Sequence, residues 1–475
     1  MSVSKKSISF HCENIHLDDG TMAAGEIACA PNEPLVVSLG QKTSDSVKLP
    51  TDAHIALGRF DPHVHFREAV IPSKEQYEEC GYASGSYEDV VNNIKKANGL
   101  YSIRSGCLAA LHGGVTAVGA MGNTPWGPVG EKRHKLTQSH YSKHGDIPIV
   151  VWPRMEPDAP SIAGHEGKDF GSTFGGSGLT GKARADMYKL WRGQAVSYHN
   201  DQARSDETLQ DFKDRENPDQ RLLHHQYFNG DTVLACQKET MEIAKEAGLS
   251  SLLARHISTG PALQQIADAA KEMPYKLPAE IGLDYVYWNQ ERLLTQKKEI
   301  ALINYRRPAH PTKADQQSLI ELTRDLVRSD YAVFFGTDHA PHPIEAKAFK
   351  DGLPGSPGTR NIEHSLQFYL ELVENYGYSW FDIDKLASIN PAKHMAQFFE
   401  FSLEVGTMQS GAMANLTIFN PNVEYTVKEG SLKTSLEDPY YHSALIGESG
   451  LRGKTLFTVS NGTVWEIGEK ISKLN

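Results

Sequence analysis

The alternation of apolar and polar positions divides the chain into three parts. Short β-like stretches separated by polar turns occupy residues 1–55. They recur at the C-terminal end, where Asn461-Gly462 is a strong signal for a hairpin turn. Between these ends, short apolar runs alternate with amphipathic segments of helical period, a pattern typical of βα units and a parallel sheet. The pattern therefore predicts an α/β core flanked by strands from both ends of the chain.

Helical periodicity is clearest over residues 232–247, 261–273 and 315–328, where apolar side chains fall on one face. The apolar runs predict eight strands, which end near His65, Met121, Pro153, Lys189, His225, His256, Glu280 and Asp338. Eight strands with interleaved helices predict a (β/α)8 TIM-like barrel. We expect this barrel over residues 56–400, and a small β-sandwich domain formed from residues 1–55 and 401–475.

Composition excludes several classes of partner. In 475 residues, 48 Lys and Arg stand against 59 Asp and Glu, which gives a formal net charge of −11. Nucleic-acid binding depends on clustered cations, so this balance argues against a DNA or RNA partner. No apolar run approaches the ~20 residues of a membrane helix, and no apolar segment of a secretory signal follows the polar N-terminus. Five cysteines without a CxxC pair indicate reduced thiols. We therefore expect a cytoplasmic protein with no membrane partner.

The first chemical signal is a pair of histidines in the segment 58–68. Alternate side chains of a strand share a face, so His63 and His65 point the same way and can bind one metal ion. An isolated pair of histidines at this spacing is more often two polar side chains of a half-exposed strand with no metal bound. The prediction of a metal site therefore depends on further residues that can act as ligands. Such residues end later apolar runs: Lys189, His225, His256 and Asp338. In a barrel, the C-terminal ends of the strands share one face, so these side chains are expected to meet there.

Motifs are spread over nearly the whole chain: Asp61–Glu68, Gly113–Pro125, Thr337–His342, Pro354–Gly358, Asn390–Met395 and Leu416–Pro421. Together they resemble those of the dihydroorotases, a family of the amidohydrolase superfamily. The resemblance implies zinc-dependent, reversible cyclisation of N-carbamoyl-L-aspartate to L-dihydroorotate in de novo pyrimidine biosynthesis. The Asp-His-Ala-Pro-His and His-Phe-Arg elements favour this family over the related hydantoinases and allantoinases.

The resemblance also implies a centre of two zinc ions per chain. Such a pair lowers the pKa of a bridging water and polarises the scissile carbonyl. An ammonium group cannot bind a cation, whereas a lysine carbamylated by CO2 is an oxygen anion that can bridge two ions. The implied ligands are His63, His65, Lys189, His225, His256 and Asp338, with carbamylated Lys189 as the bridge.

Roles in proton transfer and substrate binding follow from the same resemblance. Asp338 takes a proton from the attacking water and passes it to the leaving nitrogen. Arg67 suits bidentate binding of a substrate carboxylate, which lysine would not reproduce. The residues implied to bind substrate are Arg67, Asn123, Asn304 and His342. Arg306 and Arg307 are interpreted as solvated surface residues. The implied partner is a small molecule that carries a carboxylate, and related enzymes form homo-oligomers or associate with another pyrimidine-pathway enzyme.

Residues 154–230 admit a second interpretation. In it, residues 194–201 form the fifth strand, His199 replaces His225 as a ligand, and Lys168 or Asp169 supplies the bridge. We favour Lys189 and His225, because they give a regular order of strand, loop, helix and strand. Two other functions stay open: a hydantoinase- or allantoinase-like cyclic amidase, and a non-catalytic homologue that acts as a structural partner. If the chain were a non-catalytic homologue, some of the metal-ligating residues would be expected to be missing from the sequence.

Overall fold

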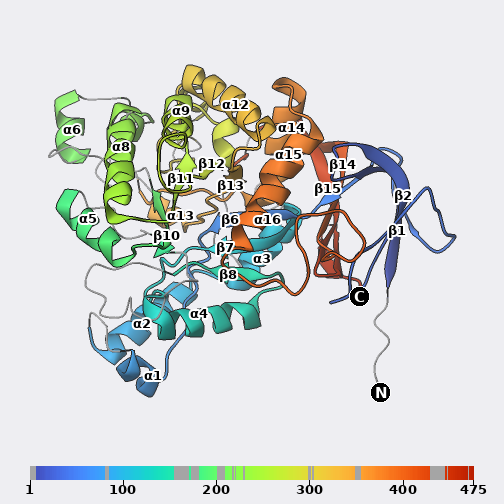
Figure 1. The fold of residues 1–475 in the computed structure, drawn as a ribbon, viewed down its shortest axis with the longest axis horizontal. Coiled ribbons are helices and arrows are strands. Elements are labelled where there is room, and N and C mark those ends of the chain that lie inside the picture. The colour runs from blue at the N-terminus through green and yellow to red at the C-terminus, as the bar shows by residue number, and fades with distance from the viewer. Residues whose placement is uncertain are drawn as a thin grey trace.

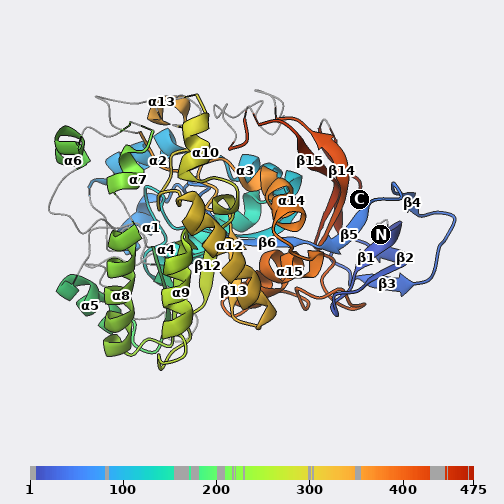
Figure 2. The ribbon, with the colours of Figure 1, turned by 90° about the horizontal axis from the view of Figure 1, so that it is seen from above.

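The computed structural model describes residues 7–80, 85–153, 171–172, 181–199, 209–216, 219, 221–227, 230–297, 301, 304–347, 355–427, 444–446, 448–468 and 470–475. A core of strands covered by helices lies beside a β-rich region in both views of the ribbon (Figures 1 and 2). The β-rich region contains strands from the first and the last parts of the chain (Figure 1).

Parallel strands of the core lie in two sheets. One has the order β6-β7-β8 and the other the order β13-β12-β11-β10-β9. Their bounds are β6 Arg59–Val64, β7 Val115–Ala120, β8 Ile149–Val151, β9 Gly171–Ser172, β10 Ala195–His199, β11 Ser251–Ile257, β12 Ala279–Gly282 and β13 Val333–Gly336. A parallel bridge between Val64 and His339 joins the end of β6 to the residues after β13. These eight described strands form the barrel, and the predicted fold class is confirmed.

Helices pack around the barrel, and several of them, such as α3 (Ile103–His112), α9 (Gly260–Ala269) and α12 (Lys313–Arg328), bury an apolar face. In α12, Thr312 caps the first turn by accepting from the Asp315 backbone N–H, and Leu319 and Val327 are buried. The other covering helices are α4 Gly130–His144, α8 Gly230–Ala247, α14 Ser365–Asn375, α15 Trp380–Asp384 and α16 Asn390–Met395. Short helices in the connections are α1 Lys74–Glu79, α2 Tyr87–Asn98, α6 Leu209–Glu216, α7 Leu223–Tyr227, α10 Gln290–Thr295 and α13 Ile344–Lys347. Six of the eight predicted strand ends fall at or next to strands of the barrel.

The strand predicted to end near Lys189 is wrong, because the segment forms helix α5 (Gly181–Leu190). Tyr188 and Trp191 are buried in the main core, whereas Lys189 and Leu190 are exposed. Burial at i and i+3 is the spacing of a helix and not of a strand. The strand predicted to end near His225 is also wrong, since that residue lies on the short helix α7.

Strands from both ends of the chain share one nine-stranded sheet of order β17-β16-β15-β14-β5-β1-β2-β3, with β4 paired to β1. Their bounds are β1 Ile8–His16, β2 Met22–Cys29, β3 Val36–Leu39, β4 Val47–Lys48, β5 His54–Leu57, β14 Leu416–Tyr425, β15 Leu451–Ser460, β16 Thr463–Ile467 and β17 Ile471–Lys473. Strand β5 joins the two halves, because it pairs in parallel with β1 and antiparallel with β14. Gly58 follows β5, and a Cβ there would lie 2.4 Å from Thr116, so the turn into β6 requires glycine.

A buried ion pair connects the β-rich region to the barrel. Arg59 of β6 donates from Nη1 to Oδ1 of Asp384 at 2.6 Å, and Oδ2 of Asp384 lies 2.7 Å from Nδ1 of His16 in β1. All three side chains are at most 4 % exposed. Burial alone would raise the pKa of Asp384, but His16 and Arg59 outweigh it and lower that pKa. The carboxylate is therefore charged and holds two elements from different regions together.

Asp384→Asn is expected to lower the free energy of unfolding by about 3–5 kcal/mol, because it leaves the Arg59 charge buried without its counter-ion. Urea denaturation measures the change. The matched control is Asp330→Asn, whose carboxylate is 84 % exposed and pairs with Lys385 at 2.8 Å. That control should cost less than about 1 kcal/mol. Equal unfolding midpoints for the two variants would refute this account of the buried pair.

Candidate metal and substrate site

The carboxyl ends of β6, β10, β11 and β13 converge on a group of titratable side chains. Parallel strands of a barrel place these ends at the same rim, which is why residues far apart in the sequence meet there. The group, called the histidine cluster below, consists of His63, His65, His199, His256 and Asp338. Ring centroids of His63 lie 5.1, 5.3 and 5.5 Å from those of His65, His199 and His256.

Three members of the histidine cluster form a donor set suited to a metal ion. His63, His65 and Asp338 each offer a ligand atom, and these atoms all lie within 4.8 Å of one another. Oδ1 of Asp338 lies 2.8 Å from Nε2 of His65 and 3.4 Å from Nε2 of His63. Two imidazole nitrogens and a carboxylate oxygen are ligands that Zn²⁺ accepts.

The outer partners of these rings show why a cation fits. Nδ1 of His63 lies 2.5 Å from a carboxylate oxygen of Glu280, and Nδ1 of His65 lies 2.9 Å from the amide oxygen of Asn123. With both Nδ1–H groups donated outward, the two Nε2 atoms carry lone pairs that face the Asp338 carboxylate. Three facing acceptors repel one another unless a cation lies between them. The arrangement therefore fits a metal ion held by these residues.

A second pair of imidazoles adjoins this set. Nδ1 of His199 and Nε2 of His256 are 2.7 Å apart. Burial lowers the pKa of His256 to about 3, and burial together with His256 lowers that of His199 well below its usual value. Both rings are therefore neutral at pH 7, which is the state that binds metals. His256 and Asp338 have φ angles of +38° and +49°, strained values that concentrate at functional sites.

Polar side chains lie next to the histidine cluster. Arg67 donates from Nη1 to the Pro341 carbonyl at 2.7 Å, and its Nη2 lies 3.1 Å from Nε2 of His342. Asn304 is fully buried, and neither its amide oxygen nor its amide nitrogen has a hydrogen-bond partner in the part of the chain that the structure describes. Arg67 thus lies beside His342, and the buried amide of Asn304 can form hydrogen bonds to a bound ligand.

Comparison with known proteins shows what the chain is similar to. No family model matches the chain. It is 27% identical to the dihydroorotase of Aquifex aeolicus (strain VF5) over 236 residues, which cover 48% of this chain and only 50% of that protein. The dihydroorotase of Clostridium acetobutylicum is 25% identical over 441 residues, 87% of this chain and 88% of the relative. The crystal structure of dihydropyrimidinase from Brevibacillus agri NCHU1002 superposes with a TM-score of 0.74 at 15% identity, over 98% of this chain and 96% of the other. The chain is therefore similar in sequence to dihydroorotases and shares its fold with a dihydropyrimidinase, both cyclic amidases of the amidohydrolase superfamily.

The prediction of a metal-dependent cyclic amidohydrolase is confirmed at the level of this family. Within the described ranges, none of the helices has both the length and the apolar character of a membrane span.

Two predicted ligands lie away from the histidine cluster. The Lys189 side chain is 62 % exposed on α5, and its Nζ lies 3.3 Å from Asp186 of the same helix. His225 stacks on His310, with ring centroids 5.6 Å apart. The structure thus places Lys189 and His225 outside the histidine cluster and brings His199 into it, as in the second interpretation of the sequence. Lys168 and Asp169, the bridging candidates of that interpretation, lie outside the described residues.

The interpretation of Arg306 as a surface residue is also wrong. Its side chain is 1 % exposed, Nη2 donates to Oδ2 of Asp338 at 2.9 Å, and Nη1 contacts Asp284. Burial acts to raise the pKa of Asp338, and the adjacent Arg306 charge acts to lower it. Sequence reasoning also assigned no role to Glu280, although it ends a predicted strand as His256 does. The place of Glu280 at the end of a predicted strand could have marked it as a candidate site residue.

Proposed function

We propose that this cyclic amidase is a zinc-dependent dihydroorotase, which interconverts N-carbamoyl-L-aspartate and L-dihydroorotate in de novo pyrimidine biosynthesis. The observation that carries the proposal is the histidine cluster with an arginine–histidine pair beside it. The cluster supplies metal ligands and a carboxylate base, and Arg67 with His342 suits an anionic substrate. Curated relatives named dihydroorotase, aligned over most of the chain, support it.

Residues of the histidine cluster would hold the metal. His63, His65 and Asp338 would bind one zinc ion, and His199 with His256 would bind a second. When bound, zinc polarises the scissile carbonyl and lowers the pKa of a water. Because Lys189 is exposed on α5, we propose that Asp169, or Lys168 after carbamylation by CO2, supplies the bridging oxygen ligand.

Asp338 is the proposed general base and acid. One of its oxygens faces the imidazoles, and Arg306 holds the other at 2.9 Å, so the carboxylate is fixed in orientation and charged. It would accept a proton from the water that attacks the ring carbonyl. As the carbon–nitrogen bond breaks, the same carboxyl would return the proton to the leaving nitrogen. Arg306 acts here as a positioning residue.

Recognition of the substrate carboxylate separates the leading function from its alternatives. Arg67 presents a planar guanidinium, which suits two parallel bonds to a carboxylate. A hydantoinase-like activity on rings without a carboxylate would leave this group without an anion. A non-catalytic homologue would be expected to lack ligands, whereas five cluster residues are present.

The first test assays the purified protein, supplied with zinc and bicarbonate, on dihydroorotate, dihydrouracil and hydantoin. We expect hydrolysis of dihydroorotate at least a hundredfold faster than of the two rings that lack a carboxylate. Metal measured on the same preparation should accompany the activity. Faster hydrolysis of dihydrouracil or hydantoin would favour the hydantoinase-like alternative, and no turnover with any ring would favour the non-catalytic one.

Arg67→Lys is expected to raise the KM for dihydroorotate about 10- to 100-fold and to change kcat much less. A charge-assisted bond to the carboxylate is worth about 1.5–3 kcal/mol, and lysine loses the bidentate geometry. Steady-state kinetics measure both constants. Arg104→Lys, at an exposed position of α3, serves as the control and should leave KM unchanged. An unaltered KM in Arg67→Lys would remove this residue from substrate binding.

A further inference from the structure

A buried lysine that the proposed reaction does not use lies close to the substrate-binding residues. Lys347 ends the short helix α13 and is 7 % exposed, whereas lysine is almost never buried unless it is paired. Within the part of the chain that the structure describes, no carboxylate acts on its pKa, and the charged side chains that do are the cations Arg67 and Arg306. A buried ammonium without a counter-ion is costly, so a function is expected for it.

The ammonium joins two backbone segments of the site. Nζ of Lys347 donates to the Tyr305 carbonyl at 3.1 Å and also to the Gly358 carbonyl. The same Tyr305 carbonyl accepts from the backbone N–H of Gly358 at 3.0 Å. Tyr305 stands between Asn304 and Arg306 in the sequence. Lys347 therefore holds the loop that contains Gly358 against the segment that carries these two residues.

Gly358 brings this loop close to the residues that follow β13. Its φ is +129°, and a Cβ there would lie 2.6 Å from the Ala340 carbonyl oxygen and 3.3 Å from Cδ2 of His342. Position 358 therefore requires glycine. The ammonium of Lys347 is thus bonded to a residue that packs on His342. Arg67 lies on another atom of the same ring, with its Nη2 3.1 Å from Nε2.

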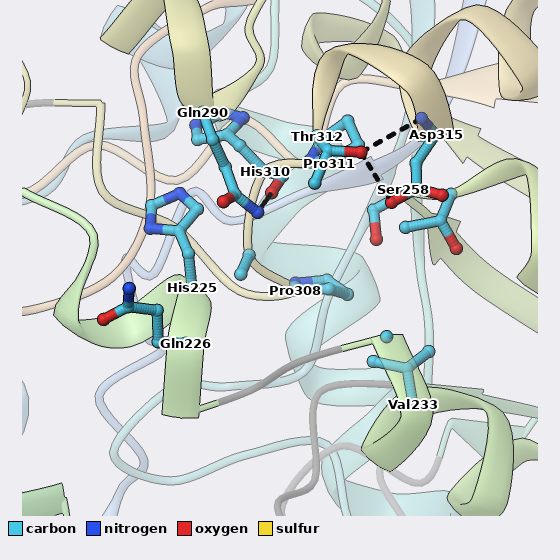
Figure 3. Close-up of a pocket in the computed structure, with 13 residues that line it drawn as sticks. His225, Gln226, Val233, Ser258, Gln290, Pro308, His310, Pro311, Thr312 and Asp315 are labelled. Carbon is cyan, nitrogen blue, oxygen red and sulfur yellow. Dashed lines mark hydrogen bonds between the residues drawn. The ribbon is translucent and has the colours of Figure 1, made fainter. Parts of the chain in front are cut away.

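Carboxylates of the neighbouring segments already have partners. Arg306 contacts Asp284 and donates to Asp338 at 2.9 Å. The segment that follows Arg306 lines a cavity of about 350 Å³ beyond the end of β11 (Figure 3). The acidic residue of that lining is Asp315, whose carboxylate accepts from the Thr312 hydroxyl at 2.8 Å (Figure 3). The ammonium is therefore placed to act on an anion that comes from outside the chain.

The surroundings of the ammonium are cationic or neutral. Burial, Arg67 and Arg306 lower the pKa of Lys347 to about 7. The same ammonium acts to lower the pKa values of His342 and His310, so it lies close to both rings. Burial is the main reason that both of these pKa values fall far below the usual range, so neither ring is charged at pH 7. A bound anion would offset the repulsion among the three cations and keep the ammonium protonated.

We propose that Lys347 is a positioning and specificity-determining residue, which favours a ligand with a carboxylate over a neutral ring. Its hydrogen bonds fix the backbone beside Asn304 and His342, and its charge adds to that of Arg67. Its donors go to backbone carbonyls, so the ammonium acts on the ligand without touching it. The inference rests on the proposed function only for the choice of a pyrimidine ring with a carboxylate as the ligand.

Titration calorimetry of the zinc-loaded protein with orotate and with uracil tests the two roles of Lys347 separately. Orotate carries a ring carboxylate and uracil lacks it. Lys347→Gln removes the charge and keeps an amide N–H donor, so it should bind orotate about tenfold more weakly and uracil as the wild type does. Lys347→Met also removes the donors, so it should bind both rings more weakly. Lys313→Gln, at an exposed position of α12, is the matched control and should change neither affinity.

Both variants at position 347 should stay folded, because they remove a buried charge and the Tyr305 carbonyl keeps its bond from Gly358. Thermal unfolding verifies this for each variant. The inference is overturned if Lys347→Gln binds orotate as tightly as the wild type, or loses affinity for uracil by the same factor. It is also overturned if the wild type shows no preference for orotate over uracil.

Hydrolysis of dihydroorotate by the wild type is a separate measurement. A wild type that binds orotate through Lys347 and hydrolyses no ring would end the catalytic proposal and leave this inference standing. A wild type that hydrolyses dihydroorotate, with orotate affinity unchanged in Lys347→Gln, would do the reverse. Failure of one proposal is therefore distinguishable from failure of the other.

Discussion

Asp338→Asn is expected to lower the rate of dihydroorotate hydrolysis about a thousandfold, because asparagine cannot accept or return the proton. The substitution keeps the size and shape of the side chain, and the amide oxygen can still face the imidazoles. Arg306 keeps its contact with Asp284, so its buried charge retains a counter-ion. The fold should therefore survive, and stopped assays with excess enzyme would measure the residual rate.

Metal content separates this effect from loss of a ligand. The Asp338→Asn protein should retain most of its zinc after dialysis, and zinc should not restore its rate. Asp325→Asn, whose carboxylate is 67 % exposed on α12, is the matched control and should turn over at the wild-type rate. A rate in Asp338→Asn above a tenth of that control would exclude this residue as the proton carrier.

His199→Ala is expected to reduce the bound zinc from about two ions per chain to about one, because it removes a nitrogen 2.7 Å from His256. Plasma mass spectrometry on dialysed protein measures the ratio. Activity should fall with the second ion, since the metal pair acts on one water and one carbonyl.

Two further variants are the controls for His199→Ala. Lys189→Ala removes an exposed side chain of α5, and His225→Ala removes a ring that contacts His310 and not the histidine cluster. Both should keep the wild-type zinc content. Loss of zinc in His225→Ala with full zinc in His199→Ala would restore the ligand set that the sequence first favoured.

The sequence predicted the parts of the site that lie on regular strands. His63 and His65 follow from strand parity, and His256 and Asp338 follow from their places after apolar runs that do form β11 and β13. Turns and helices bound these runs clearly, so the strands predicted from the local pattern are strands of the barrel in the structure.

Prediction failed where a short apolar run fits two structures. The segment 187–191 is compatible with a strand or with one turn of a helix, and only the packing of Tyr188 and Trp191 in the core decides for the helix. Arg306 was missed for a different reason. Its partners Asp284 and Asp338 are distant in sequence, so nothing local indicated that its charge would be buried.

The position of β5 in the sheet has a consequence for synthesis on the ribosome. Leu57 of β5 pairs with Leu416 of β14, and the next residues lead directly into the strand that carries His63. During translation, one edge of β5 stays open until β14 has been made, and open edges invite pairing with other chains. A nascent chain that pauses before Leu416 would thus need a chaperone, or rapid elongation, to protect the strand next to His63 and His65.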